Sequence, residues 1–439
     1  MNDRYRNSRE LLARAEKVIP VASQTFSKSR VQFPEGHAPL FLTHGEGGRV
    51  WDVDGNSYVD LICGLLPVVL GYRDPDVDGA VRAQLEKGIT FSLPSPLETE
   101  LAERLVEVIP CAEMVRFGKN GTDATSAAIR LARAFTGRDR VVALGYHGWQ
   151  DWYIGATTRN KGVPGRVSAL THKLPFNDLE AVKEVLETHS DEVAAVILEP
   201  VGAQEPAPGY LEALRELTRD NGTLLVFDEI ITGFRVALGG AQAHYGVTPD
   251  LAAFGKAMGN GMPISAVVGR SDIMLEMEEV FFSGTFGGET LSIAAAIAVI
   301  DKMRREPVIE TLWDSGQKLG KLLQEAAQRH GLEDVFQPAG LPPWQPIAIS
   351  AHEQGSVPAV KTLFLKEMLA RGVLVGGSLN VCWAHGDTDL EEVGSALNQT
   401  FARLAEELER GALDDRLDIP VVQPVFQPRP NAETGRGKI

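Results

Sequence analysis

Short apolar runs alternate with segments of helical spacing through the middle of this 439-residue chain, and this alternation restricts its fold more than any other feature. Parallel strands need a crossover connection, which is usually a helix. The pattern therefore predicts an α/β domain with a mostly parallel sheet and helices on both faces. The apolar runs lie at 114–118, 140–146, 192–200, 223–229, 250–254 and 264–268, and the helical segments lie at 122–136, 178–188, 210–220, 289–304 and 309–330.

The two ends of the chain have a different pattern. A helical pattern at 8–18 precedes a small antiparallel meander at 40–62, in which Asp54-Gly55 is a hairpin turn signal. After about residue 335, short apolar runs and two helical patterns indicate a smaller α+β unit. We expect an N-terminal segment that joins the small domain, a large domain, a C-terminal small domain and an extended tail. Their boundaries are expected at 1–63, 64–305, 306–415 and 416–439.

Composition and charge exclude several classes of function. The formal net charge of −16 argues against a surface for nucleic acid or an anionic membrane, because both need a basic footprint. The longest apolar run, near 61–70, contains Gly64 and Pro67 and is too short to span a bilayer. The polar N-terminus shows no secretory pattern, so we expect a cytoplasmic protein.

The three cysteines are Cys63, Cys111 and Cys382. No two are close enough in sequence to form a metal knuckle or a redox pair. We therefore expect free or buried thiols in a reducing compartment, and no metal site.

Asp228 and Lys256 are the strongest candidate catalytic residues. Asp228 closes the apolar run at 223–229, and Lys256 lies among small and apolar neighbours at 252–259. A lysine in this setting can form a Schiff base with an aldehyde cofactor, while the carboxylate keeps the ring nitrogen of that cofactor protonated. Two structural explanations stand beside this one. An Asp at the end of a strand is often a helix cap, and a Lys between glycines is often a solvated loop residue.

Further polar residues follow the apolar runs, which is where ligands bind in open parallel sheets. Gly121-Thr122 opens a helix and could hold a phosphate, although a simple capped turn would look the same. Tyr146, followed by His147, could lie on a planar ring or belong to an aromatic core. Glu199 follows another run, and Thr285 lies between glycines as a second phosphate candidate.

Many motifs occur in one order over roughly residues 40 to 300, and together they carry a resemblance. They are GEGGRVWDVDGNSYVD, VRFGKNGTDATSAAIRLARAFTGRDRVV, GYHG, AAVILEP, LLVFDEIITGFR, TPDLAAFGKAMGNGMPISAVVG and SGTFGGETLSIAAA. The chain resembles the class III (fold type I) aminotransferases that depend on pyridoxal 5'-phosphate (PLP), in particular the branch of glutamate-1-semialdehyde 2,1-aminomutase. The resemblance implies a large domain with a seven-stranded, mostly parallel sheet, a smaller α+β domain from both chain ends, and a homodimer with active sites at its interface.

The resemblance also implies roles for individual residues. Lys256 would form the Schiff base with PLP and carry protons between the two imine carbons. Asp228 would pair with the pyridine nitrogen, and Thr285 would reach the phosphate bound by the neighbouring subunit. The other positions implied to contact the cofactor are Asn120, Gly121, Thr122, Tyr146, His147, Glu199 and Ile230.

Several positions depart from the family pattern. Ile231 and Gln204 replace a glutamine and a gating glutamate that other members carry. Lys28, with Arg30 two residues on, matches the arginine that binds the substrate carboxylate in the aminomutases. The gating loop of the aminomutases is shortened around 376–385. The residues expected to face the substrate are Lys28, Arg30, Trp152, Gln204 and Asn380.

The expected function is a transaminase that moves an amino group from an amino acid, glutamate in the first place, to a small or sugar-like aldehyde or ketone. The alternative is a 2,1-aminomutase, which moves the amino group within one carbon skeleton. A PLP-binding protein without catalysis is disfavoured because Lys256 is present and no DNA-binding module precedes the domain. A dinucleotide-binding dehydrogenase is disfavoured because no G-x-G-x-x-G follows an apolar run.

Overall fold

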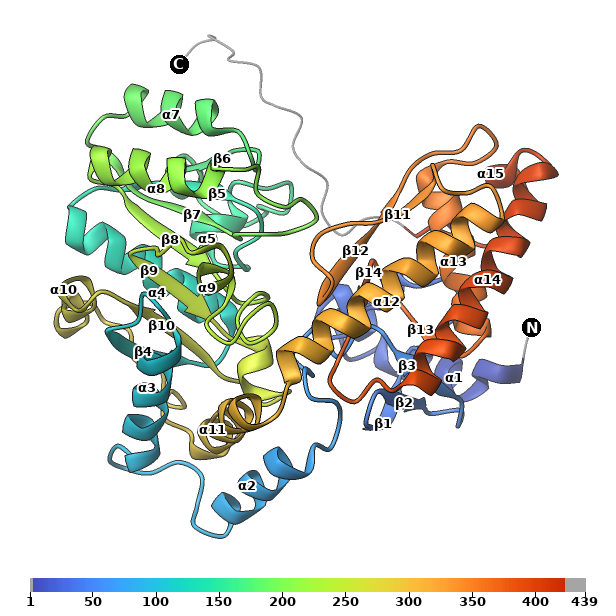
Figure 1. Cartoon of the computed structure of the whole chain (residues 1–439), viewed down its shortest axis with the longest axis horizontal. Coiled ribbons are helices and arrows are strands. Elements are labelled where there is room, and N and C mark those ends of the chain that lie inside the picture. The colour runs from blue at the N-terminus through green and yellow to red at the C-terminus, as the bar shows by residue number, and fades with distance from the viewer. Residues whose placement is uncertain (1–2, 423–439) are drawn as a thin grey trace.

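Seven strands form the central sheet of the computed structural model, which describes residues 3–422 (Figure 1). The expected tail at 416–439 lies outside the described residues from 423 on. The spatial order is β4-β10-β9-β8-β7-β5-β6, and the pairs among β5 to β9 are all parallel. The strands are β4 (Met114–Gly118), β5 (Arg140–Leu144), β6 (Thr171–Lys173), β7 (Val193–Leu198), β8 (Leu224–Asp228), β9 (Leu251–Phe254) and β10 (Ser265–Gly269).

Strand β10 runs antiparallel to both of its neighbours, β4 and β9. The connection at 255–264 that precedes it contains only the short 3-10 helix Lys256–Gly259. Because a parallel pair needs a crossover of about a dozen residues or more, the chain turns back instead. Lys256 therefore lies in a tight turn at the end of β9.

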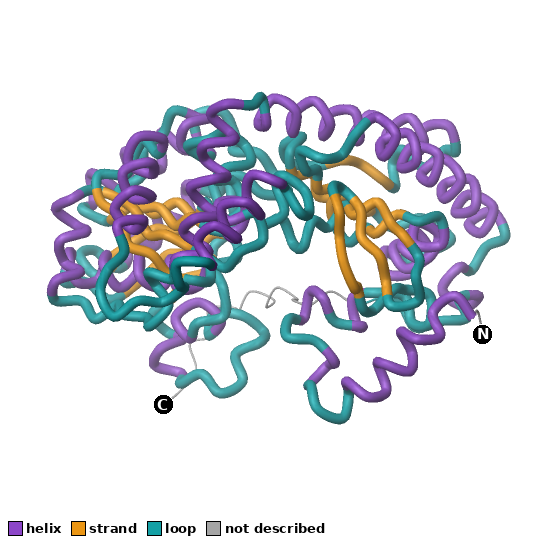
Figure 2. The backbone as a smooth tube through the Cα atoms, turned by 90° about the horizontal axis from the view of Figure 1, so that it is seen from below, coloured by secondary structure: helices purple, strands orange, loops and turns teal. Residues whose placement is uncertain are grey.

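Helices cover both faces of this sheet (Figure 2). Strand side chains alternate between two apolar clusters, so that Val226 and Ala253 pack with the helix at 121–136, whereas Phe227 and Phe254 belong to the larger cluster. The sheet is thus buried on both sides, as parallel sheets usually are. The helices of this part are α2 (Pro75–Leu85), α3 (Pro96–Val108), α4 (Gly121–Thr136), α5 (Asp151–Ile154), α6 (Gly165–Ser168), α7 (Leu179–Thr188), α8 (Tyr210–Asn221), α9 (Ala241–Tyr245), α10 (Ser271–Met274) and α11 (Thr290–Arg305).

The two ends of the chain meet in a smaller α+β unit (Figure 1). The expected N-terminal meander is present, and β13 adds to it in parallel next to β3. A second sheet has the order β11-β12-β14. The strands are β1 (Leu42–Glu46), β2 (Arg49–Asp52), β3 (Ser57–Asp60), β11 (Phe336–Pro338), β12 (Trp344–Ile349), β13 (Val373–Leu374) and β14 (Ser378–Asn380), and the helices are α1 (Arg6–Ala15), α12 (Val308–Arg329), α13 (Val357–Ala370), α14 (Asp387–Glu409) and α15 (Leu413–Arg416).

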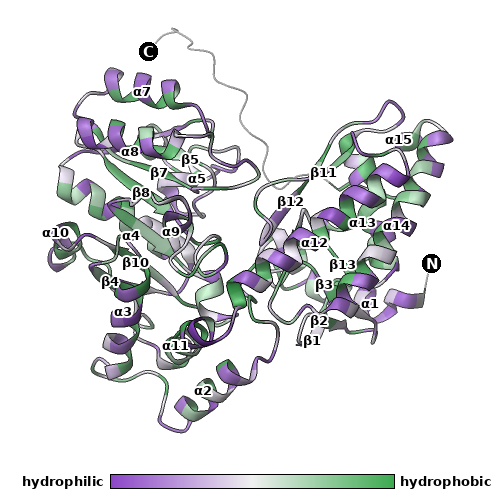
Figure 3. Cartoon of the chain, in the orientation of Figure 1, coloured by the Kyte–Doolittle hydropathy of each residue, from purple (hydrophilic) through white to green (hydrophobic). Residues whose placement is uncertain are grey.

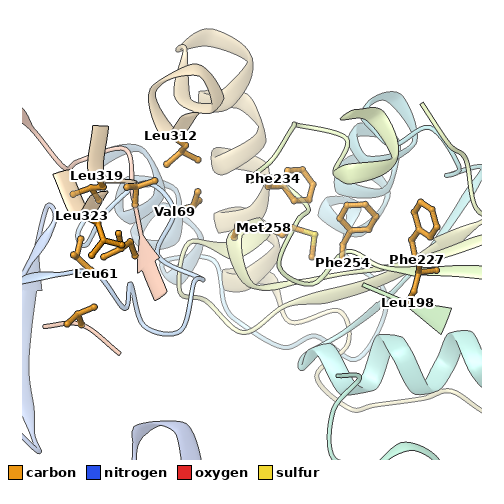
Figure 4. Close-up of a cluster of buried hydrophobic side chains, with 14 of the residues drawn as sticks. Leu61, Val69, Leu198, Phe227, Phe234, Phe254, Met258, Leu312, Leu319 and Leu323 are labelled. Carbon is orange, nitrogen blue, oxygen red and sulfur yellow. The ribbon is translucent and has the colours of Figure 1, made fainter. Parts of the chain in front are cut away.

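One hydrophobic cluster connects the two parts of the molecule. Phe227 and Phe254 of the central sheet belong to the same cluster as Leu312 and Leu319 of α12, and Met258 lies in the row between them (Figure 4). The turn that carries Lys256 is therefore held in the core where the two parts meet.

Hydrophobic residues line most of the central strands (Figure 3). Among residues 3–422, no helix combines the length and the apolar character that a bilayer crossing requires.

Candidate active site

Four neighbouring strands deliver polar side chains to one edge of the central sheet. Strands β5, β7, β8 and β9 are parallel neighbours, so their carboxyl ends meet there. His147 follows β5, Glu199 follows β7, Asp228 ends β8 and Lys256 follows β9. The alternation read from the sequence therefore places these four residues together.

Asp228 and His147 form a buried pair. Asp228 Oδ2 lies 2.8 Å from Nδ1 of His147, and Asp228 Oδ1 accepts a hydrogen bond from the Ile230 N–H at 3.1 Å. Nε2 of His147 lies 3.2 Å from the carbonyl oxygen of Leu144. Both ring nitrogens thus face acceptor oxygens, an arrangement that an imidazolium satisfies fully. The pair holds the Asp228 carboxylate in one orientation at the end of β8.

Glu199 lies beside this pair. Its Oε2 accepts the backbone N–H of Tyr146 at 3.0 Å. Burial raises the pKa of Glu199, and the nearby Asp228 carboxylate raises it further. Gly145 has a φ of +109°, and a Cβ there would lie 2.5 Å from Glu199 Oε2. Only glycine at this position therefore leaves room for the carboxyl group.

Lys256 is the basic group of the site. Burial lowers the pKa of Lys256 to about 8, and the carboxylates of Glu199 and Asp228 oppose that shift. Its φ of +42° is left-handed, which is rare for a residue with a side chain. Such backbone strain collects at functional sites. The site therefore holds an amine that is partly neutral near physiological pH.

The N-terminus of α4 carries a further buried polar group. The hydroxyl of Thr122 is buried and has no hydrogen-bond partner. Gly148 has a φ of +99°, and a Cβ there would lie 2.4 Å from Thr122 Oγ1. A Cβ on Gly121 would lie 3.0 Å from Ile230, and one on Gly255 would lie 3.1 Å from Ile230. An orphaned hydroxyl and the free N–H groups of a 16-residue helix suit a phosphate.

Ser265 was not predicted as a site residue from the sequence, although it lies next to both Gly118 and Gly255. It is fully buried, and its hydroxyl has no partner. A Cβ on Gly118 would lie 2.8 Å from Ser265 Oγ, and one on Gly255 would lie 3.6 Å from Ser265 Cβ. Only the antiparallel pairing of β10 brings it here, and a serine at a strand start gives no local signal.

The comparisons with known proteins agree with this geometry. A family model described as aminotransferase class-III matches residues 31–380. The chain belongs to the class-III aminotransferases. Its similarity to 3-aminobutyryl-CoA aminotransferase of Cloacimonas acidaminovorans (strain Evry) is 37% identity over 412 residues, which is 91% of this chain and 98% of that protein. Its similarity to glutamate-1-semialdehyde 2,1-aminomutase of Syntrophobacter fumaroxidans (strain DSM 10017 / MPOB) is 39% over 399 residues, which is 84% of this chain and 92% of that protein.

A solved structure is similar over nearly the whole aminotransferase. The FumI protein of Sphingopyxis sp. MTA144, solved in a form that contains PLP, has a TM-score of 0.85 at 30% identity and covers 92% of this chain and 97% of its own. The expected family, the fold type I architecture and PLP as cofactor are thereby confirmed. The residues around Lys256 fit PLP, because they offer an amine, a buried carboxylate and an orphaned hydroxyl at a helix N-terminus.

Two aromatic residues of this aminotransferase differ in exposure. Tyr146 is 47% exposed and meets the buried Tyr153 edge to face, with ring centroids 5.6 Å apart. Trp152 is buried, and its Nε1–H donates to Ser126 at 3.0 Å on α4. Tyr146 is therefore partly exposed, whereas Trp152 lies in the core beside His147.

The remaining expected cofactor contacts are exposed. Asn120 precedes α4, and its backbone N–H donates to Asp123 at 2.8 Å. Thr285 lies on the exposed segment 283–286. The Lys119 ammonium lies 3.0 Å from Glu289 Oε2, and this ion pair ties the corner at α4 to the end of that segment. Within residues 3–422, no hydrogen bond joins Thr285 to Lys256 or Thr122.

The expected substrate residues do not gather in one place. Lys28 is exposed and lines a cavity of about 810 Å³, together with Asn260 and other residues. Arg30 pairs instead with Glu16 at 2.7 Å and lines a different cavity. This geometry separates Lys28 from Arg30, and the described residues that line the Lys28 cavity do not include Lys256.

Two more expected substrate residues have roles in the framework. The buried Asn380 donates from Nδ2 to the carbonyl oxygen of Ile62 at 3.0 Å and accepts from Ser378 at 2.8 Å. Gln204 is exposed on the loop after β7, where its carbonyl oxygen accepts from Gly202 N–H at 3.2 Å.

Proposed function

We propose that this enzyme is an intermolecular transaminase that takes an amino group from an amino acid, glutamate in the first place, and passes it to a small or sugar-like aldehyde or ketone. The choice of a transaminase over an aminomutase rests on the packing of segment 376–385. Val381, Cys382 and His385 are buried there, and the Trp383 N–H donates to the carbonyl oxygen of Val69 at 2.8 Å. Residues 379–382 and His385 therefore pack in the core, whereas Gly377 is exposed.

That packing favours transfer between molecules. An aminomutase must retain one carbon skeleton while its amino group leaves one carbon and returns to another, which favours a lid over the site. A segment with buried side chains and main-chain hydrogen bonds has little freedom to act as a lid. A transaminase releases its keto product between two half-reactions and needs no such retention.

The roles of the residues follow from their positions. Bound at this site, PLP supplies an electron sink for the charge left when a proton leaves the amino-bearing carbon. Lys256 would hold the cofactor covalently and then, as a free amine, move that proton. Asp228, fixed by His147, would keep the ring nitrogen charged. Thr122 and the first turn of α4 would hold the phosphate.

The side chains around the ring would orient it. Tyr146 and Ile230 would lie on opposite faces, and Glu199 would lie at the phenolic edge. His147 would act through Asp228, and Asn120 would flank the phosphate. The substrate roles of Lys28, Arg30, Trp152, Gln204 and Asn380 stay proposals, and the cavity at Lys28 supports that residue before the others.

We also propose a homodimer, in which Thr285 of one protomer reaches the phosphate site of the other. Its support is an exposed apolar surface formed by residues 89–93 and 281–286. Leu93 is 80% exposed and Phe281 is 81% exposed. The chain just after the second segment contacts the first, because the Thr290 N–H donates to the carbonyl oxygen of Ile89 at 3.0 Å. Apolar patches of this kind mark interaction sites.

A cytoplasmic location is part of the same proposal. The three cysteines are free and buried, which fits a reducing compartment. The reactants are small molecules, an amino donor and a carbonyl acceptor.

A half-reaction experiment tests the transaminase. Enzyme loaded with PLP is mixed with glutamate and no acceptor, and the absorption of the bound cofactor is recorded while 2-oxoglutarate is measured. We expect the absorption to change and about one 2-oxoglutarate to appear per active site, because ping-pong transfer stops after the first half. The Lys256→Ala variant is the control and should release none. Failure with glutamate and with a panel of other amino donors would contradict the transaminase and favour the aminomutase.

A further inference from the structure

Three metal-ligating side chains meet in the small domain, away from the cofactor site. Cys63 follows β3, while Cys382 and His385 follow β14. Both cysteines are 1% exposed, and His385 is 4% exposed. One ligand atom from each residue lies within 4.8 Å of the other two. Two thiols and an imidazole are thus gathered in one buried site.

The backbone holds Cys63 in a strained conformation. Its φ is +50°, a left-handed value that is strained for a residue with a side chain. Its Sγ lies 3.3 Å from the carbonyl oxygen of Asp60 and 3.5 Å from that of Asn380. The N–H groups of Ile62 and Cys63 both donate to the Asp60 carboxylate, which fixes the turn. The thiol is therefore presented towards β14 by a turn that is held in place.

The backbone fixes the imidazole of His385 at both ring nitrogens. Its Nε2 lies 3.2 Å from the carbonyl oxygen of Gly48, which only accepts, so Nε2 carries the proton. A Cβ on Gly48 would lie 2.2 Å from His385 Cδ2, so only glycine leaves room for the ring. The lone pair of Nδ1 accepts the backbone N–H of Cys382 at 3.1 Å, and a cation at Nδ1 would replace this hydrogen bond. A backbone carbonyl on the far nitrogen is the usual support of a ligating histidine.

We propose that Cys63, Cys382 and His385 bind one thiophilic cation, Zn(II) or Cu(I). Two thiolates with an imidazole are a soft donor set that suits these two ions and not Mg²⁺ or Ca²⁺. On binding, two metal–sulfur bonds form and the two thiol protons pass to solvent, so no oxidant or reductant takes part. The cation joins the turn after β3 to the segment after β14 across the junction of the two chain ends.

The structure indicates a stabilising role for this cation. Arg235 donates to the carbonyl oxygens of Val381 at 2.8 Å and Leu66 at 2.9 Å, each a few residues from one of the cysteines. The same two backbone segments would thus be held by a buried guanidinium and by the cation. The proposal is independent of the transaminase reaction.

Metal analysis of the full-length, PLP-loaded enzyme tests the proposal. Zn(II) and Cu(I) are added in separate arms, excess metal is removed by gel filtration, and bound metal and Tm are measured. We expect about one ion per chain and a raised Tm in at least one arm, and the arm that binds identifies the ion. The absorption of bound PLP should not change, which separates this test from that of the transaminase.

Two variants and a control locate the site. Cys63→Gly should fold, because glycine adopts a φ of +50° without strain. Cys63→Gly and Cys382→Ser should each lower bound metal at least about tenfold. Cys111→Ser removes a buried cysteine outside the cluster and should bind metal as the wild type does. Equal binding by Cys63→Gly and wild type, no binding in either arm, or a Cys63–Cys382 disulfide found by mass spectrometry in the freshly purified enzyme would overturn the proposal.

Discussion

At the scale of single residues, the pKa of the Lys256 amine is set by two opposing influences. Burial removes water from the ammonium and favours the neutral form, while Glu199 and Asp228 favour the charged form. The lowered pKa, about 8, means that burial outweighs the two carboxylates. An amine with this pKa is a better base and nucleophile near neutral pH than an ordinary lysine.

This balance predicts a pH dependence that is measurable without turnover. In the PLP-free chain, an acylating reagent should label Lys256 with a midpoint near pH 8, because the amine loses its proton there as the pH rises. An ordinary lysine titrates near about 10.4 and should be labelled later. Peptide mass spectrometry across a pH series measures the labelling of Lys256 and of the surface lysines. The Lys256→Ala variant assigns the Lys256 peptide. A Lys256 midpoint that coincides with the surface lysines would refute the lowered pKa.

At the scale of elements, the N-terminus of α4 has hydrogen-bond donors that an anion could use. Thr122 presents a buried hydroxyl without a partner, and Thr125 one turn later donates to the carbonyl oxygen of His147 at 3.0 Å. This hydrogen bond holds α4 against the turn at 145–148, and the Thr122 hydroxyl is left without a partner. In the free chain this arrangement costs stability, since an unpaired buried hydroxyl loses its hydration.

Removal of that hydroxyl should weaken phosphate binding specifically. Thr122→Val should raise the Kd of PLP about 10- to 100-fold, as expected for a lost hydrogen bond to a charged group. Its Kd for pyridoxal, which lacks the phosphate, should stay the same, and the Tm of the free chain should not fall. Thr125→Val is the matched control and should lower the Tm instead. Equal losses for PLP and pyridoxal in Thr122→Val would show that Thr122 does not face the phosphate.

At the scale of the whole molecule, the exposed segments 89–93 and 281–286 lie close to the cofactor corner. Lys119, two residues before α4, pairs with Glu289, three residues after the second segment. Coverage of this surface by a second copy would therefore be coupled to cofactor binding.

The dimer is testable through Phe281. Phe281→Glu should weaken the dimer at least about tenfold and shift sedimentation towards the monomer, since a charge would be buried in an apolar interface. The Kd of PLP should rise in the same variant, because Thr285 of the partner protomer would be lost. Val18→Glu is the control, because Val18 is 78% exposed on another part of the surface. A wild-type chain that sediments as a monomer at micromolar concentration would contradict the proposal.

The sequence by itself determined the elements and the centre of the site. Strand–helix alternation predicted the parallel strands, and parallel strands bring their carboxyl ends together. Asp228 and Lys256 could therefore be placed side by side before any coordinates. Helix α8 spans Tyr210–Asn221 where the pattern predicted 210–220, because apolar spacing is a local property of the chain.

Only the tertiary structure decided features that depend on packing between distant segments. Arg30 and Lys28 are two residues apart, yet Glu16 draws the Arg30 side chain away from the cavity that Lys28 lines. Cys63 and Cys382 had no spacing to suggest a shared site, and the Asn380 N–H, which donates to the carbonyl oxygen of Leu61 at 3.1 Å, brings their segments together. A sequence pattern carries periodicity and local chemistry, whereas the partner of a side chain is set by which surfaces bury each other.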